Sequence, residues 1–167
     1  KRHGMIVTVH SGGPSIPGSN RIWADDLIAL DPHICAHVNG GPTSLPNEDL
    51  VRIVRDTRFT LELIQAGSTK SMVDIVELAK EFRCLDRIII GTDTPTGSGI
   101  QPLGLWKTIG HVAWLGRVAY PEALAWQKGN VPPQGVHHQR GKMNPSLEDS
   151  LARDVPEGHG DAVGLLA

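Results

Sequence analysis

Residues 87–95 read Arg-Ile-Ile-Ile-Gly-Thr-Asp-Thr-Pro, and this stretch decides the expected fold. A short isoleucine run that ends abruptly in turn residues is typical of a strand buried on both faces of a parallel sheet. Asp93 stands where this strand gives way to the loop 94–99. Carboxylates at the carboxyl ends of such strands often carry chemistry, although Asp also favours turns and helix N-caps.

Two earlier apolar runs end in the same way, each with a histidine. The run Met5–Val9 is followed by His10 and then by Ser-Gly-Gly-Pro. The run that begins at His33 reaches His37 and then Gly40-Gly41-Pro42. We therefore predict buried strands at both places, with a histidine at the end of each strand.

The rest of the pattern alternates between strands and helices. A further strand is predicted at Phe59–Ala66, and helices are predicted at Asn20–Leu30, from Pro46, from Thr69 or Ser71, at Gln101–Arg117 and at Pro121–Lys128. Four strand-helix units of roughly 30 residues indicate an α/β fold with a parallel sheet, either half of a (β/α)8 TIM barrel or a doubly wound sheet. No Gly-x-Gly-x-x-Gly turn follows a strand, which disfavours a nucleotide-binding doubly wound sheet.

Composition excludes several classes of function. The chain has 167 residues, 40% of them hydrophobic and 20% charged, with a net charge of -2. No basic field favours nucleic acid or an anionic membrane, and no apolar run approaches the roughly 18 residues that span a bilayer. The two cysteines, Cys35 and Cys84, adjoin apolar strands, so we expect a reduced, cytoplasmic protein.

The pattern ends near residue 131, which divides the chain into two expected parts. Residues 1–131 form the α/β region, and residues 132–167 form an irregular tail with scattered proline and glycine. The tail is expected to be disordered or to wrap the surface. The four tryptophans, Trp23, Trp106, Trp114 and Trp126, fall on predicted helices and are expected to pack in the core.

Three strand-end residues form the candidate site: His10, His37 and Asp93. In a parallel barrel all strands point one way, so these side chains would meet at one rim. Two imidazoles and a carboxylate suit Zn²⁺, Fe²⁺ or Mn²⁺. A rival ligand set, His33, Cys35 and His37, alternates along one strand, but successive same-face residues are about 6.6 Å apart, too spread to share one ion comfortably.

The sequence resembles the amidohydrolase superfamily of metal-dependent hydrolases, and among them the enamidase-like cyclic amide hydrolases. The resemblance is carried by three segments, residues 6–13 (Ile-Val-Thr-Val-His-Ser-Gly-Gly), 37–43 (His-Val-Asn-Gly-Gly-Pro-Thr) and 90–99 (Ile-Gly-Thr-Asp-Thr-Pro-Thr-Gly-Ser-Gly), and covers roughly residues 5–130. It implies a (β/α)8 barrel of which this chain supplies strands five to eight.

The resemblance also implies roles for the three residues. His10 and His37 would ligate one metal of a binuclear Zn or Fe centre, and Asp93 would ligate the other metal and act as general base. The reaction would be hydrolysis of a C–N bond in a cyclic amide or a related small substrate, by an enzyme that is a homo-oligomer when intact.

Several features depart from the family pattern and leave alternatives open. The family's His-x-His pair on strand one and bridging Lys on strand four have no counterpart here, so we expect a C-terminal fragment that is inactive alone. The chain begins just before a strand pattern, from which we expect a piece of a longer chain, and the DNA upstream of Lys1 would show whether it encodes the missing half. Our hypothesis for the tail is a frame-slipped remnant of a small β domain, or a degraded gene. The alternatives are a non-catalytic remnant of such an enzyme and a deaminase of the same superfamily.

Overall fold

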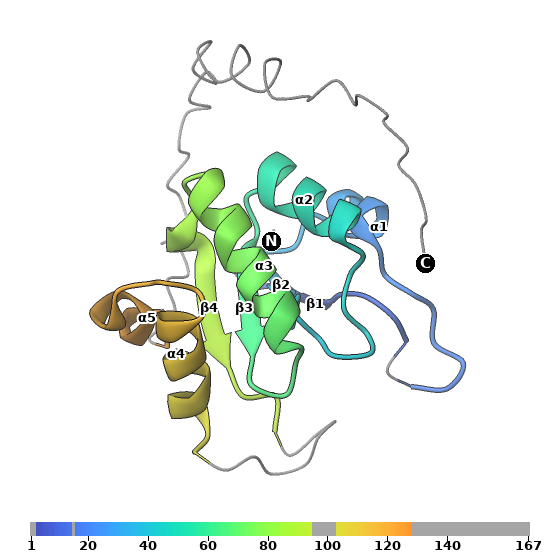
Figure 1. The fold of residues 1–167 in the computed structure, drawn as a ribbon. Helices are drawn as coiled ribbons and strands as arrows, with labels where there is room; N and C mark the ends of the chain where they lie inside the picture. The colour runs from blue at the N-terminus through green and yellow to red at the C-terminus, as the bar shows by residue number, and fades with distance from the viewer. Residues whose placement is uncertain (1–2, 15, 95–102, 128–167) are drawn as a thin grey trace, which may run out of the picture. The chain divides into compact units, whose positions relative to one another are not determined.

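A computed structural model describes residues 3–14, 16–94 and 103–127 of the chain (Figure 1). Within this part, four strands pair in parallel in the order of the sequence: β1 (Thr8–His10), β2 (Ile34–Ala36), β3 (Thr60–Ile64) and β4 (Ile88–Gly91). The order contains no reversal of direction, whereas doubly wound sheets reverse at their ligand-binding crevice. The predicted α/β fold with a parallel sheet is confirmed.

Helices connect the strands and form a layer along the sheet. They are α1 (Ala24–Leu30), α2 (Asn47–Asp56), α3 (Thr69–Glu81), α4 (Leu105–Trp114) and α5 (Tyr120–Trp126), with a short 3₁₀ helix, η1 (Leu85–Arg87), before β4. Each helix packs against the next one in the sequence, from α1 on α2 to α4 on α5 (Figure 1). Each crossover returns the chain to the same end of the sheet, which parallel pairing requires.

Local signals explain where the longest helix begins and which way it faces. The Ser68 side chain accepts a hydrogen bond from the Ser71 N–H, 3.2 Å away, and caps the first turn of α3. Met72, Ile75, Val76 and Ala79 are its buried residues, and their spacing of three and four places them on one face. That face packs on the sheet.

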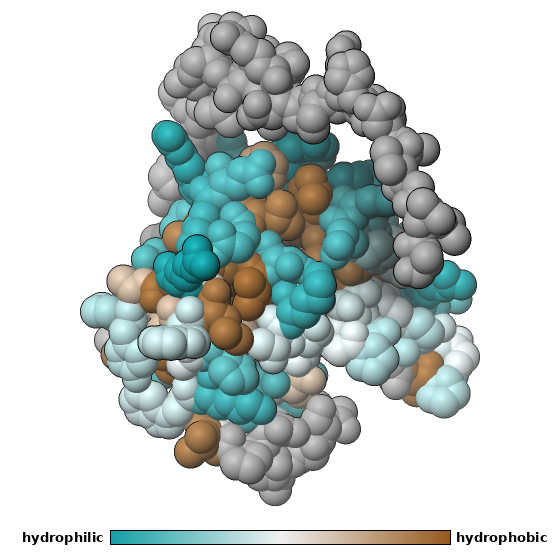
Figure 2. Space-filling model, in the orientation of Figure 1, coloured by the Kyte–Doolittle hydropathy of each residue, from teal (hydrophilic) through white to brown (hydrophobic). Residues whose placement is uncertain are grey.

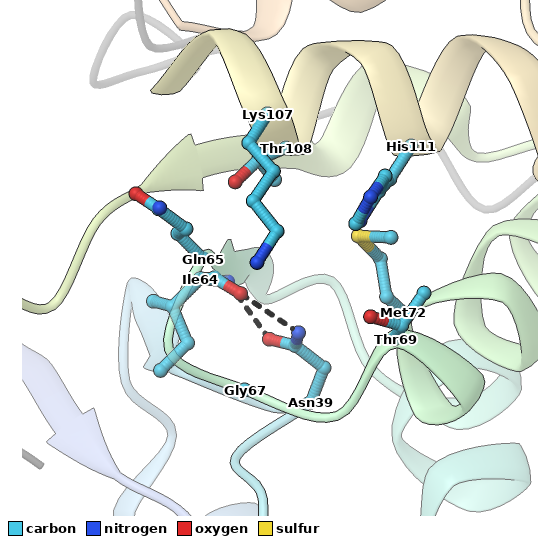
Figure 3. A pocket seen from close by; sticks show the side chains of 9 residues that line it. All are labelled: Asn39, Ile64, Gln65, Gly67, Thr69, Met72, Lys107, Thr108 and His111. Atoms are coloured by element: carbon cyan, nitrogen blue, oxygen red, sulfur yellow. Dashed lines mark hydrogen bonds between the residues drawn. The ribbon is translucent and has the colours of Figure 1, made fainter. Parts of the chain in front are cut away.

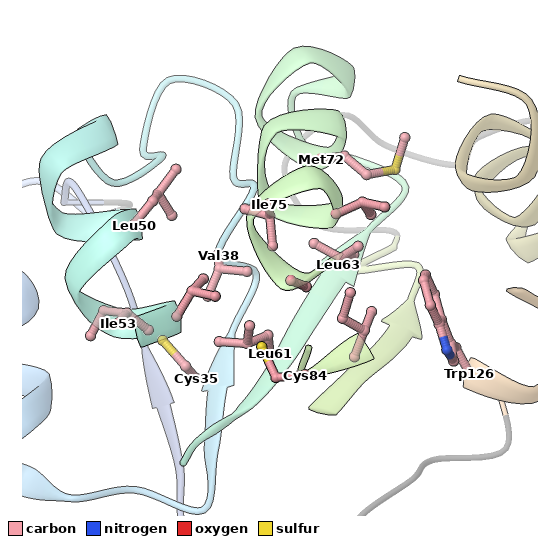
Figure 4. Packing of buried hydrophobic residues seen from close by; sticks show 14 of the residues in the cluster. Cys35, Val38, Leu50, Ile53, Leu61, Leu63, Met72, Ile75, Cys84 and Trp126 are labelled. Carbon is pink, nitrogen blue, oxygen red and sulfur yellow. The ribbon is translucent and has the colours of Figure 1, made fainter. Parts of the chain in front are cut away.

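The core lies between the sheet and the helix layer. Cys35, Leu61 and Leu63 of the strands meet Leu50 and Ile53 of α2, and Ile75 of α3 adjoins them (Figure 4). All six side chains are buried. The surface over the helices is mostly polar, with apolar side chains in small patches between polar ones (Figure 2).

The strand ends differ from the sequence prediction at β1. The predicted buried strand Met5–Val9 is wrong in its burial and in its start: the strand begins at Thr8, none of its three residues is buried, and Met5 and Ile6 are 62% and 52% exposed. The reason is that β1 is an edge strand of the described sheet, so within this part of the chain it has a strand neighbour on one side only. Cross-strand neighbours on both sides are needed to bury such a run.

The first helix also starts later than predicted. Residues 20–23 are not helical, because Ile22 forms an antiparallel bridge with Gly12 through backbone hydrogen bonds of 2.8 and 2.9 Å. This bridge folds the loop after β1 back on itself. α1 begins only at Ala24, and the Asp26 carboxylate in its first turn accepts a hydrogen bond from the N–H of Trp23, the residue before the helix.

The tryptophan prediction is correct for only part of the set. Trp126 is 1% exposed and belongs to the core, whereas Trp106 and Trp114 are 61% and 85% exposed. Helical position alone does not decide burial, because the two exposed side chains lie on the solvent side of α4. Their presence on a helix with buried Ile109 and Val112 was the misleading signal.

Some predictions concern residues outside the described ranges. They are the loop beyond Thr94, the boundary near residue 131 and the tail 132–167. None of the helices in the described part has both the length and the apolar character needed to cross a membrane.

Candidate functional site

The candidate residues lie at the carboxyl ends of the sheet's strands. His10 is the last residue of β1, His37 directly follows β2, and Asp93 comes two residues after β4. The strands are parallel, so these positions all fall at the carboxyl ends of the strands, the edge where α/β proteins place their ligands.

The two histidines are in direct contact. Nδ1 of His10 and Nε2 of His37 are 2.9 Å apart, and the rings meet edge to face with centroids separated by 4.4 Å. On its other side, Nε2 of His10 lies 2.9 Å from the carbonyl oxygen of Gly13. A proton on that Nε2 is donated to Gly13, which leaves Nδ1 of His10 with a free lone pair directed at His37.

The surroundings of His37 favour its neutral form. Burial lowers its pKa from the ordinary value, and the neighbouring His10 lowers it further. The negative charges of Asp93 and Glu62 act in the opposite direction and are weaker. A neutral imidazole is the form that binds metal ions, so His37 is ready to act as a ligand near neutral pH.

Asp93 lies near this pair but is more exposed. Its negative charge acts to raise the pKa of His37, so the exposed carboxylate lies within interaction distance of that imidazole. Both Asp93 (φ 53°) and His37 (φ 38°) adopt the left-handed backbone conformation. Asp and His tolerate this region better than most residues, and left-handed residues concentrate at functional sites.

The two ring nitrogens fit one metal ion. Zinc binds imidazole at about 2.0 to 2.1 Å, so two nitrogens of a tetrahedral site lie about 3.3 Å apart. The observed 2.9 Å requires an opening of only a few tenths of an ångström. The bond from His10 to Gly13 matches the backbone hydrogen bond that orients metal-binding histidines elsewhere.

In the described part of the chain, the histidine pair has no third metal ligand beside it. Across residues 3–14, 16–94 and 103–127, no group of three or more His, Cys, Asp or Glu side chains is already close enough to hold a metal. The structure therefore brings His10 and His37 together and leaves Asp93 at the margin of the pair.

The rival set is not brought together. His33 uses its Nδ1 to accept the Val7 N–H at 2.9 Å, a contact that ties β2 to the start of β1. Cys35 is fully buried on the helix side of the sheet, and burial raises the pKa of its thiol to about 12. Cys35 is thus a small apolar core residue, as the sequence suggested.

Two polar residues near the site were missed by sequence reasoning. Glu62 lies in the middle of β3, and Asn39 is buried in the turn after β2, where its amide pairs with both backbone groups of Ile64. A single Glu within the apolar run 59–66 was the available signal. It could have been recognised as a charged residue facing the site edge.

A small pocket lies beyond this turn, between α3 and α4 (Figure 3). Lys107 and His111 extend into it from α4 and face Asn39 and Met72 (Figure 3). Its lining does not include His10, His37 or Asp93. The hydroxyl of Thr108 is buried there without a hydrogen-bond partner in the described part of the chain.

Comparisons with known proteins agree with the motifs. The chain is 35% identical over 170 residues to the enamidase of Eubacterium barkeri, an alignment that takes in 99% of this chain and 44% of the relative. It is also similar to a crystal structure of enamidase, described as a new member of the amidohydrolase superfamily, with a TM-score of 0.72 and 36% identity over 77% of this chain and 34% of that one.

These percentages show how much of each protein the similarity covers. No family model matches the chain. The chain spans less than half of the curated relative that it matches. The resemblance inferred from the three motifs is confirmed: this chain is similar, in sequence along almost its whole length and in fold, to part of an enzyme of the amidohydrolase superfamily.

Proposed function

We propose that this chain is part of a metal-dependent hydrolase that cleaves a C–N bond in a cyclic amide or a related small molecule. The carrying observation is the 2.9 Å contact between His10 and His37 at the ends of adjacent parallel strands. The similarity to enamidase supports the class of reaction. In this proposal the four strands correspond to strands five to eight of a (β/α)8 barrel.

His10 and His37 hold one divalent metal, zinc or iron, and Asp93 contributes to a second metal position. The superfamily generally uses divalent metals, which supply a water of lowered pKa, near 7, and polarise a carbonyl. Asp93, exposed at the rim, accepts the proton of the attacking water and passes it to the leaving nitrogen. A small cyclic substrate, assembly as a homo-oligomer and a cytoplasmic location complete the proposal.

A metal-binding experiment tests the role of the histidine pair. Zinc binding is measured by calorimetry and by metal analysis for the chain and for H10A, H37A and H3A. His3 is exposed and lies outside the sheet, in a turn before β1, so H3A is the matched control. We expect H10A and H37A to weaken zinc binding at least tenfold, because each removes one ligand, and H3A to leave it unchanged. Equal binding by all four proteins would contradict the site.

A non-catalytic remnant is the second candidate. It is favoured by the lack of a preassembled group of three ligands within the described residues. No bound metal and no turnover by the chain would support the remnant. A panel of cyclic amides and aminated heterocycles, tested on metal-loaded protein, would separate an amide hydrolase from a deaminase.

A further inference from the structure

Glu62 lies on the same face of the sheet as His10. The register pairs His10 with Ala36, and Cys35 with Leu61, so Ala36 stands beside Glu62. His10, Ala36 and Glu62 thus form one row across β1, β2 and β3. Side chains in such a row point to the same face, opposite the face on which Cys35 and Leu61 enter the core.

The carboxylate of Glu62 binds the backbone of His37. Oε2 of Glu62 accepts the His37 N–H at 3.2 Å. The next backbone N–H, that of Val38, donates to the main-chain oxygen of Glu62 at 3.0 Å. Glu62 therefore clamps the two residues at which the chain leaves β2, and His37 takes its left-handed conformation within this clamp.

Gly91 leaves the space that the carboxylate occupies. A Cβ at position 91 would come within 2.7 Å of Oε1 of Glu62, closer than Cβ atoms are found to other heavy atoms. Gly91 does not need a positive φ, since it is not among the residues with that conformation. The absence of a side chain at the end of β4 thus leaves room for the carboxylate in its present position, and a methyl group there would displace it.

Among the described residues, the charge of Glu62 has no basic partner. Within residues 3–14, 16–94 and 103–127, no lysine or arginine forms an ion pair with it. A half-buried carboxylate without a cationic partner is unfavourable, and a purely structural clamp could use a neutral acceptor. A divalent cation held by the nearby histidines would supply the missing positive charge.

We infer that Glu62 is a positioning residue for His37, which fixes the left-handed turn that directs the His37 imidazole to His10, with Gly91 providing the space for its carboxylate. This inference rests on the proposed metal site for its purpose, but its geometry is independent of any metal. Partners that orient a ligand typically change metal affinity by about 10 to 100-fold when removed.

The experiment compares E62A, E62Q and G91A with E48A, which removes an exposed glutamate on α2. The ¹H–¹⁵N signal of the His37 amide and the imidazole ¹⁵N signals report the clamp and the His10–His37 bond without metal. Zinc affinity is measured in parallel. We expect E62A to shift both sets of signals and to weaken zinc binding by about 10 to 100-fold. E48A should leave all of them unchanged.

The other two variants separate positioning from simple destabilisation. E62Q retains an oxygen that accepts the His37 N–H, so its histidine signals should stay close to those of the parent. G91A keeps the carboxylate but displaces it, so it should reproduce the E62A signals, and adding G91A to E62A should change them no further. If E62A does not fold, the contrast between E62Q and G91A decides the question.

Each outcome has a defined meaning. Histidine signals that are unchanged in E62A, or in G91A, would overturn the inference. Signals that shift as expected in a chain that binds no zinc would support the positioning role and refute the proposed metal site. The two failures are therefore distinguishable.

Discussion

Replacing Asn39 with alanine should destabilise the chain markedly, because the buried Asn39 amide binds the backbone of the neighbouring strand. The Asn39 side chain is 1% exposed and sits in the turn after β2. Its Nδ2 donates to the Ile64 carbonyl at 3.0 Å, and its Oδ1 accepts the Ile64 N–H at 2.8 Å. A weaker contact of 3.4 Å reaches the Ser68 carbonyl. The amide thus replaces a strand partner at the end of β3.

The magnitude follows from the groups that are left behind. Alanine leaves the buried N–H of Ile64 without a partner, which costs about 1 to 3 kcal/mol, and removes one of two hydrogen bonds to the Ile64 C=O, worth about 1 kcal/mol, since the Gly67 N–H still reaches that oxygen at 3.3 Å. Water can enter the vacated space beside Gly67 and recover part of this, so we expect a loss of about 2 to 4 kcal/mol in the free energy of unfolding. The midpoint of thermal unfolding should fall by roughly 2 to 4 °C for each kcal/mol.

Urea unfolding followed by circular dichroism measures this loss. N20A is the matched control, because Asn20 is exposed and its removal should change stability by less than about 0.5 kcal/mol. A loss in N39A of under about 1 kcal/mol, or one equal to that of N20A, would refute the argument that the amide ties β2 to β3.

Three further predictions concern single side chains. Burial and the neighbouring His10 lower the pKa of His37 in the folded chain. As the pH drops through about 6.5, the unfolded chain therefore takes up a proton before the folded chain does, and the free energy of unfolding should fall. H37Q should flatten this pH dependence in urea titrations between pH 8 and 5, and an unaltered slope would contradict the role assigned to His37. Cys35 and Cys84 are buried, and burial raises the pKa of both thiols. Both cysteines should therefore resist Ellman's reagent at pH 8 until urea unfolds the chain. Rapid labelling of Cys35 in the folded chain would show that it is not a core residue. W114S should reduce the iodide-quenchable fluorescence, part of which remains with the exposed Trp106, at a cost below about 0.5 kcal/mol. W126A should cost about 3 to 5 kcal/mol, because Trp126 is the buried member of the set; comparable losses in stability would contradict the assigned exposures.

The sequence was sufficient for the class of fold and for the histidine pair. Apolar runs that end in glycine-rich turns gave the strands, and the parallel arrangement followed from their alternation with helices. The strands are shorter than the runs, as at β3, where pairing covers Thr60–Ile64 rather than 59–66. Apolar periodicity reports burial, and burial extends beyond the residues that pair.

The parts that were missed depend on contacts between distant residues. Glu62 is 25 positions away from the His37 N–H that it binds, and no local pattern signals that contact. The exposure of Met5 and Trp114 likewise depends on what lies beside them in space, which a helix or strand pattern does not record. The role of Asp93 stays a prediction, since its carboxylate is close enough to influence His37 but is not part of a ligand group.

Arg87 lies at the amino-terminal ends of the strands, opposite the candidate site. Its guanidinium donates to the carbonyl oxygens of Val54 at 2.7 Å and Phe59 at 2.9 Å, where α2 ends and β3 is about to begin. The same group also reaches Thr57 at 3.3 Å. One end of the strands thus carries stabilising contacts and the other carries the candidate site, an arrangement common to parallel α/β proteins. Substitutions that stabilise the region around Arg87 lie at the opposite end of the strands from the candidate site, so a search for stabilising mutations should begin there.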